Sequence, residues 1–95
     1  MQRFEQLTVS NTVKQLTAAI FQPQTYMKAR KAMITVDDAA IRFTTDGSTP
    51  TTLIGHSSGS GDVISLESAD EIRHFKAIRS TGTDAIINVT YSYGE

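Results

Sequence analysis

Apolar and polar residues alternate along much of this 95-residue chain, which is the pattern of half-buried β-strands. The longest alternating run is 85–93, where Ile87, Val89, Tyr91 and Tyr93 share one face. Shorter segments of the same kind are bounded by turn residues and predict further strands. In chain order, these are 5–10, 12–16 about a turn at Asn11, 31–36, 40–45, 52–54, 62–66 and 75–79.

The links between these segments are short and polar. Residues 37–39 join the strands 31–36 and 40–45, so we expect these two strands to form an antiparallel hairpin. The segment 17–26 has no clean period and is predicted as a loop. The glycine- and serine-rich run 56–62 is predicted as an exposed loop.

Ser68 and Glu71 have the spacing of a capping box, which predicts one helical turn at 69–73. Seven to eight short strands with at most one helical turn indicate an all-β protein, a single small antiparallel β-sandwich of immunoglobulin-like or jelly-roll-like type. The length fits one domain, residues 1–95. Residues 31–95 carry the recognisable motifs, and residues 1–30 form either an N-terminal arm or extra strands.

The run 42–51 contains the clearest turn in the chain. Asp46 can accept a hydrogen bond from the backbone two residues further on, and Gly47 can adopt a positive φ without a Cβ clash. Pro50 fixes φ and removes a hydrogen-bond donor, so the chain cannot continue as a central strand. These three residues predict a structural corner.

Composition narrows the possible functions. The chain has no cysteine, which excludes disulfide scaffolds and thiolate chemistry. Residues 1–36 carry a net charge of +4 and residues 37–95 one of −5, but the pI of about 6.1 argues against a nucleic-acid partner. No apolar run is long enough to span a membrane, and the N-terminus lacks the apolar stretch of a signal peptide, so we expect synthesis in a cytoplasm and no membrane partner.

No residue pattern indicates a catalytic site. His56 and His74 lie outside any recognisable catalytic motif, and the adjacent acids at 37–38 and 70–71 are typical of solvated turn residues. The glycines at 55–61 lack the following helix and lysine of a phosphate-binding loop. We therefore expect no enzymatic activity, no catalytic, cofactor-binding or metal-binding residues, and no cofactor.

The stretch 40–51, Ala-Ile-Arg-Phe-Thr-Thr-Asp-Gly-Ser-Thr-Pro-Thr, resembles the signature of chitobiase C-terminal-like domains, which are small immunoglobulin-like sandwiches. The likeness covers about residues 32–93. A wider set of residues along the chain looks like the pattern found in small proteins of tailed bacteriophages and prophages, which are taken to be virion structural proteins. That set comprises residues 40–43, 46–47, 50–51, 55–56, 61–66, 72, 75–79 and 89–91.

The phage resemblance implies a non-enzymatic protein that is made in the bacterial host cytoplasm and located in the virion, such as a capsid decoration (cement) protein or another head-associated protein. Its partners would be the major capsid protein or neighbouring head or tail proteins, together with further copies of itself. The candidate contact surface lies in the basic N-terminal third and comprises Phe4, Ile20, Phe21, Tyr26, Met27, Lys28, Arg30 and Lys31. The alternative is that these apolar residues close one end of the sandwich.

The competing hypothesis is a carbohydrate-binding or adhesive immunoglobulin-like module. Sugar-binding sandwiches usually present a flat aromatic surface, often a tryptophan. This chain has no tryptophan and only three tyrosines, at positions 26, 91 and 93. Because Tyr91 and Tyr93 share a face with apolar residues, we expect them to belong to the core.

Overall fold

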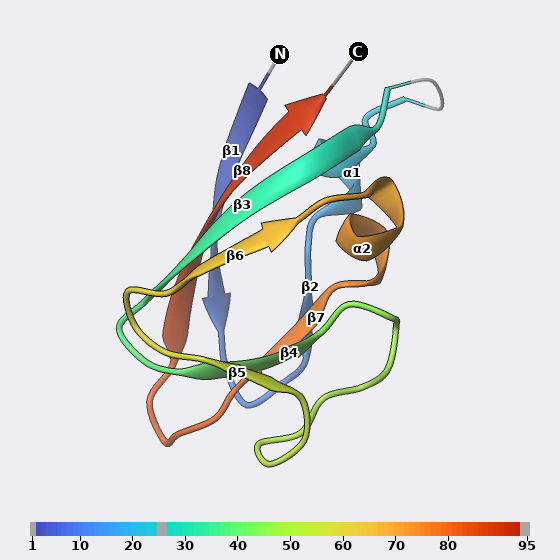
Figure 1. Cartoon of the computed structure of the whole chain (residues 1–95). Coiled ribbons are helices and arrows are strands. Elements are labelled where there is room, and N and C mark those ends of the chain that lie inside the picture. The colour runs from blue at the N-terminus through green and yellow to red at the C-terminus, as the bar shows by residue number, and fades with distance from the viewer. Residues whose placement is uncertain (1, 25–26, 94–95) are drawn as a thin grey trace.

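The computed structural model describes residues 2–24 and 27–93, which form two four-stranded antiparallel sheets (Figure 1). Sheet A has the order β1 (Gln2–Val9), β8 (Ala85–Tyr93), β3 (Ala29–Asp37) and β6 (Val63–Leu66). Sheet B has the order β2 (Lys14–Gln15), β7 (Lys76–Arg79), β4 (Ile41–Thr44) and β5 (His56–Ser58). The protein is a small all-β sandwich, as the alternating sequence pattern predicts.

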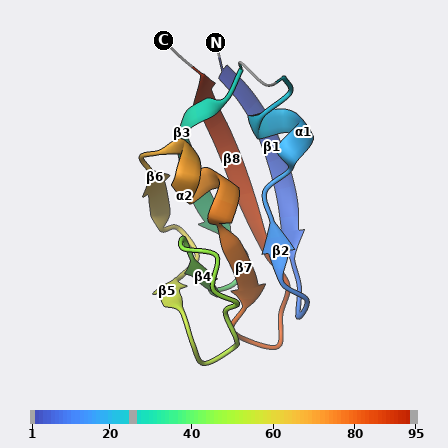
Figure 2. The ribbon, with the colours of Figure 1, turned by 90° about the vertical axis from the view of Figure 1, so that its right-hand side faces the viewer.

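Two short helices, α1 (Ala18–Phe21) and α2 (Ala69–His74), lie on the side of the molecule that faces the viewer in Figure 2. Helix α2 begins at the predicted capping box, where Ser68 Oγ accepts from Glu71 N at 3.2 Å and Glu71 Oε1 accepts from Glu67 N at 2.7 Å. Helix α1 lies inside the predicted loop 17–26, and it adds a second helical turn to the single one that the sequence predicts. Four residues are too few to show a 3.6-residue period.

The predicted hairpin of strands 31–36 and 40–45 is wrong. β3 lies in sheet A between β8 and β6, and β4 lies in sheet B between β7 and β5. The link between them contains Asp38 in a left-handed conformation (φ 75°), and the chain passes there from one sheet to the other. Both strands place their apolar faces toward the interior, so they meet across the core rather than through backbone hydrogen bonds.

The region between β4 and β6 also differs from the prediction. Residues 52–54, predicted as an edge strand, form a turn, and the strand β5 begins at His56, inside the predicted glycine/serine loop. β5 pairs with β4, placing His56 opposite Phe43. Here the backbone partner, and not the local composition, determines which residues are extended.

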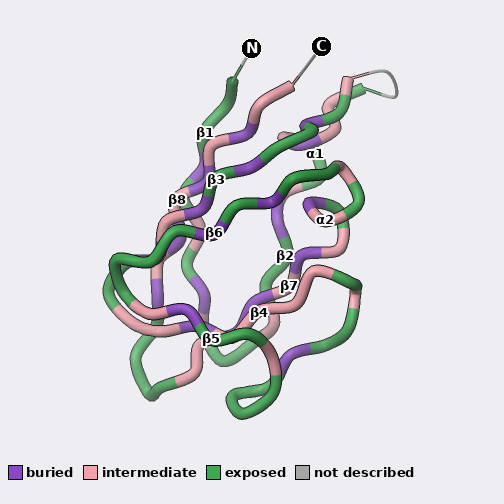
Figure 3. Tube along the Cα trace, viewed as in Figure 1, coloured by how far each residue is buried: buried purple, intermediate pink, exposed green. Residues whose placement is uncertain are grey.

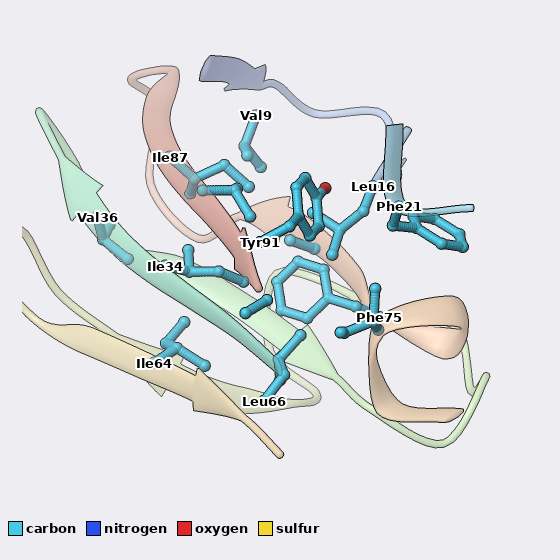
Figure 4. Close-up of a cluster of buried hydrophobic side chains, with 14 of the residues drawn as sticks. Val9, Leu16, Phe21, Ile34, Val36, Ile64, Leu66, Phe75, Ile87 and Tyr91 are labelled. Carbon is cyan, nitrogen blue, oxygen red and sulfur yellow. The ribbon is translucent and has the colours of Figure 1, made fainter. Parts of the chain in front are cut away.

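The core lies between the two sheets and closes against both helices (Figure 4). Its largest fully buried side chains include Tyr91 of β8 and Phe75, the residue between α2 and β7. The Phe21 and Tyr91 rings lie with their centroids 6.4 Å apart, and those of Phe43 and Phe75 5.6 Å apart. Each sheet thus contributes its inward-facing alternate residues to one shared interior.

Residues of the N-terminal third belong to both sheets. β1 pairs with β8 over its full length, from Gln2 opposite Ser92 to Val9 opposite Ala85. β2 pairs with β7, and Val9, Leu16 and Phe21 are buried in the core. Of the two alternatives considered for this segment, the described residues 2–24 have the contacts of extra strands and not those of a free arm.

Candidate contact surfaces

The residues proposed from the sequence as a contact surface do not gather in one place. Phe21 is buried against Tyr91, and Ile20 is half-buried against the core. Met27 is half-buried, and Tyr26 lies outside the described residues. The remaining members, Phe4, Lys28, Arg30 and Lys31, are exposed. Phe21 in particular cannot serve as a contact residue, because its ring closes the interior.

Exposed apolar side chains instead occur on the outer face of sheet A, the face that points away from the core. Phe4 of β1 is 62% exposed, Met33 of β3 51% and Val63 of β6 59%. The strand registers place Phe4, Thr90, Met33 and Ser65 in one row across all four strands. Apolar and polar side chains thus alternate along this row, and Val63 lies in the next row, opposite Thr35.

Polar side chains surround this row. Asn88 accepts a hydrogen bond from Gln6 Nε2 and donates one to Asp37 Oδ2, each at 2.8 Å, and so links β1, β8 and β3. Lys31 and Ser92, together with Thr90, Met33 and Ser65 of the row itself, line a shallow hollow of about 260 Å³. The hollow is open and is too small and shallow to enclose a drug-sized ligand.

The loop between β4 and β5 forms a second surface feature. Asp46 Oδ1 accepts a hydrogen bond from Ser48 N at 3.0 Å. This bond is the largest cause of the lowered pKa of the exposed Asp46 carboxyl. Gly47 has φ +90°, and Pro50 is fully buried. The hydrogen bond of Asp46 and the positive φ of Gly47 are the roles that the sequence assigns to these two residues. Figure 3 shows the loop as exposed apart from a short buried stretch.

Leu53 and Ile54 stand at the tip of this loop and are 82% and 65% exposed. The backbone groups of Thr51 and Ile54 bond to each other in both directions, at 2.9 and 3.3 Å. Thr51 Oγ1 also accepts from the backbone N–H groups of Leu53 and Ile54, at 3.2 and 3.0 Å. The tip is thus a closed turn that holds two large apolar side chains in water, and it lies at the end of the molecule opposite to the start of β1 and the end of β8 (Figure 1).

Sequence reasoning missed this tip because it assigned residues 52–54 to a strand. The signal was nevertheless present: two consecutive large apolar residues follow Asp46, Gly47 and Pro50 and precede Gly55, all of them turn-forming types. Met33 and Val63 were missed for a different reason. Both lie at the polar positions of alternating strands, where a single apolar residue is common on protein surfaces.

One carboxylate lies inside the sandwich. Glu5, 9% exposed, faces inward from β1 and accepts hydrogen bonds from the Tyr91 hydroxyl, from Thr17 Oγ1 (2.6 Å) and from Thr17 N (3.2 Å). Burial, and then the hydrogen bond to Glu5, raises the pKa of the Tyr91 hydroxyl. This cluster joins β1, β8 and the start of α1. Its groups satisfy one another, so its role is structural.

His56, His74 and Asp70 each contact a different part of the molecule. The His56 ring packs on Phe43 with a centroid distance of 5.4 Å, and the His74 ring lies beside Gly47. Asp70 pairs with Arg73 at 2.8 Å on the surface of α2. Within residues 2–24 and 27–93, no group of three or more possible ligands gathers that could hold a metal ion.

The tyrosines of β8 do not offer a flat surface for a sugar. Tyr91 is fully buried, and Tyr93 is half-buried with its hydroxyl donating to the Ile20 carbonyl. Among the residues that the structure describes, no helix is long and apolar enough to span a bilayer. Comparison with family models, curated proteins and solved structures finds no significant match to this chain.

Proposed function

We propose that this protein is a non-enzymatic structural protein that docks on an assembled protein particle. The particle is a tailed-bacteriophage virion, and the position is the head, as a decoration protein or another head-associated component. The resemblance of the wider set of residues, 40–43, 46–47, 50–51, 55–56, 61–66, 72, 75–79 and 89–91, to phage structural proteins supports the type of particle. The exposed apolar loop tip supports docking as the activity.

The observation that carries the proposal is the exposure of Leu53 and Ile54 on a closed turn. Two neighbouring apolar side chains held in water form a small apolar patch that a partner can cover. Because four hydrogen bonds already fix the turn, docking would order little additional backbone. Burial of each side chain in a partner pocket would contribute about 1.5–3 kcal/mol.

The stabilising effect depends on a partner surface that is present only in the assembled shell. A pocket formed at a junction between shell subunits is present only after assembly, so a protein that binds it stabilises the assembled state by mass action. A specific contact of this kind buries roughly 1,200–2,000 Å² in total. The loop tip supplies only the anchor, and the surrounding polar loop residues would form the rim.

Two experiments test this proposal. Mass spectrometry of purified particles of the phage or prophage that encodes the chain should detect the protein at a fixed ratio to the major capsid protein. Its absence from such particles would refute the virion assignment. In the second experiment, purified protein is sedimented with particles made without it, and the wild-type protein should pellet with them.

The docking role of the tip is tested with the double variant Leu53→Ser, Ile54→Ser in the same sedimentation assay. It should keep its circular dichroism spectrum and thermal midpoint but stay in the supernatant. The matched control is Val63→Ser, which removes a similarly exposed apolar side chain from sheet A. Full binding by the double variant, or loss of binding in the control alone, would show that the tip is not the anchor.

A further inference from the structure

The strand β1 offers an unpaired edge. It is eight residues long, lies at the end of sheet A and pairs with β8 only. Within the described part of the chain, no other backbone group bonds to the main chain of Gln2–Val9. An edge strand of this length presents a row of free N–H and C=O groups that can pair with another strand.

The order of residues at the start of β1 is complementary to itself. Gln2-Arg3-Phe4-Glu5-Gln6 has the same type at both ends, opposite charges at the second and fourth positions and an aromatic residue at the centre. A two-fold axis through Phe4 would therefore place Arg3 opposite Glu5 of a second copy. The same axis would place Phe4 opposite Phe4, and Gln2 opposite Gln6.

From this self-complementary edge we propose that β1 pairs antiparallel with β1 of a second copy of the chain, with the two-fold axis at Phe4. The pairing joins the two A sheets into one continuous eight-stranded sheet with an isologous interface. Phe4, 62% exposed in the single chain, then lies against its counterpart at the centre of the outer face. The row of Phe4, Thr90 and Met33 continues into the second copy.

Charge selects this register over the alternatives. A parallel, in-register pair places Arg3 opposite Arg3 and Glu5 opposite Glu5, and an antiparallel pair centred on Glu5 again brings the two carboxylates together. An antiparallel pair centred on Gln6 leaves Arg3 opposite Val9. Like charges that face each other directly across a ladder are destabilising, whereas opposite charges stabilise it.

Arg3 lies on the inner side of the strand, in the row of Tyr91, which is the position where a charge usually discourages edge pairing. In the proposed register, the carboxylate of Glu5 from the second copy lies opposite it and compensates the charge. Glu5 uses three hydrogen bonds within its own chain, and a carboxylate can accept about four. The inner side therefore also permits the pairing.

The dimer does not rest on the proposed docking function. The loop tip at Leu53 and Ile54 lies at the other end of the molecule from the strand start at Gln2 (Figure 1), so both features can act at once. A monomeric protein that sediments with particles would refute the dimer alone. A dimer that fails to sediment would refute the docking alone.

The first test is the oligomeric state of the full chain by analytical ultracentrifugation over a concentration series. We expect a monomer–dimer equilibrium for the wild-type protein. Arg3→Glu turns two attractive cross-strand pairs into repulsive ones and should weaken association about tenfold or more. The control Arg30→Glu makes the same charge change at an exposed position on β3 and should leave association unchanged. A wild-type monomer at the highest soluble concentration would overturn the proposal.

The second test fixes the register and does not depend on how Arg3→Glu folds. The chain has no cysteine, so single cysteines can be introduced at Phe4 or at Gln6, both on the outer side of β1. The Cα atoms of directly opposed residues lie about 4.5–5.5 Å apart, within reach of a disulfide. Under mild oxidation, Phe4→Cys should form a covalent dimer and Gln6→Cys should not. Cross-linking of Gln6→Cys alone, or of neither variant, would overturn the proposal.

Discussion

Removal of one oxygen atom, in Tyr91→Phe, tests the role of the buried carboxylate in holding β1 to the sandwich. The Tyr91 hydroxyl donates to Glu5 from the neighbouring strand, and both side chains face the core. The phenylalanine ring keeps the packing of the tyrosine ring, including its contact with Phe21. The variant therefore removes a hydrogen bond and leaves the core volume nearly unchanged.

The size of the effect follows from what remains around Glu5. Both hydrogen bonds from Thr17 stay, so the Glu5 carboxylate keeps two of its three hydrogen bonds. A hydrogen bond to a charged group is worth about 1.5–3 kcal/mol, and we expect the free energy of unfolding to fall by that amount. For a domain of this size, the thermal midpoint should fall by about 6–24 °C.

The assay is urea unfolding followed by circular dichroism, at one fixed protein concentration because dimerisation would contribute to stability. The matched control is Tyr93→Phe, whose half-buried hydroxyl donates to the neutral Ile20 carbonyl and should cost only about 0.5–1.5 kcal/mol. Combining Tyr91→Phe with Thr17→Val should reveal a coupling of at least about 0.5 kcal/mol, since both residues bind Glu5. A Tyr91→Phe variant as stable as the wild-type protein would refute this account of the cluster.

Four further predictions concern the turn, the core and the N-terminal third. Gly47→Val should cost about 1–3 kcal/mol in urea unfolding because Gly47 has φ +90°, whereas Gly82→Val, where no strained backbone or close atom is found, should cost clearly less. NMR titration should place the Asp46 pKa below its ordinary value of 3.8, so the turn's electrostatic contribution is complete above that value and is lost as pH falls through the lower, folded-state pKa. Phe75→Ala should cost about 3–5 kcal/mol in the same unfolding assay, and a smaller loss would mean that the core can collapse around the gap. Deletion of residues 1–24 removes two strands and three core side chains, so the circular dichroism spectrum should be that of an unfolded chain; a folded fragment would contradict the placement of β1.

The sequence predicts those parts of the fold that depend on local physics. Strand β8 is recognisable because its inward residues alternate over nine positions, and α2 because Ser68 and Glu71 form a capping box. The Asp46–Gly47 turn is recognisable because each residue type has its own backbone role. In all three cases, the residues that determine the structure are neighbours in the chain.

The parts that were missed depend on distant partners. β3 and β4 are adjacent in sequence, but β8 and β6 take both edges of β3, which leaves none for β4. β5 is extended because it pairs with β4, although its own composition is that of a loop. For the contact surfaces, the sequence shows that Phe21 and Leu53 are apolar, but only the fold shows that one is buried and the other exposed.

The buried cluster and the free edge of β1 are connected through strand register. A slip of one residue against β8 would turn Glu5 outward and Phe4 inward, and a slip of two would separate Glu5 from the Tyr91 hydroxyl. Glu5 therefore fixes which side chains of β1 face outward, and so which of them lie on the outer side of the proposed dimer interface. Tyr91→Phe should therefore lower the yield of the Phe4→Cys cross-link at temperatures where the protein is still folded. An unchanged yield would show that the Glu5 cluster does not control the edge of β1. The apolar residues Leu7 and Val9 would then determine the register of β1.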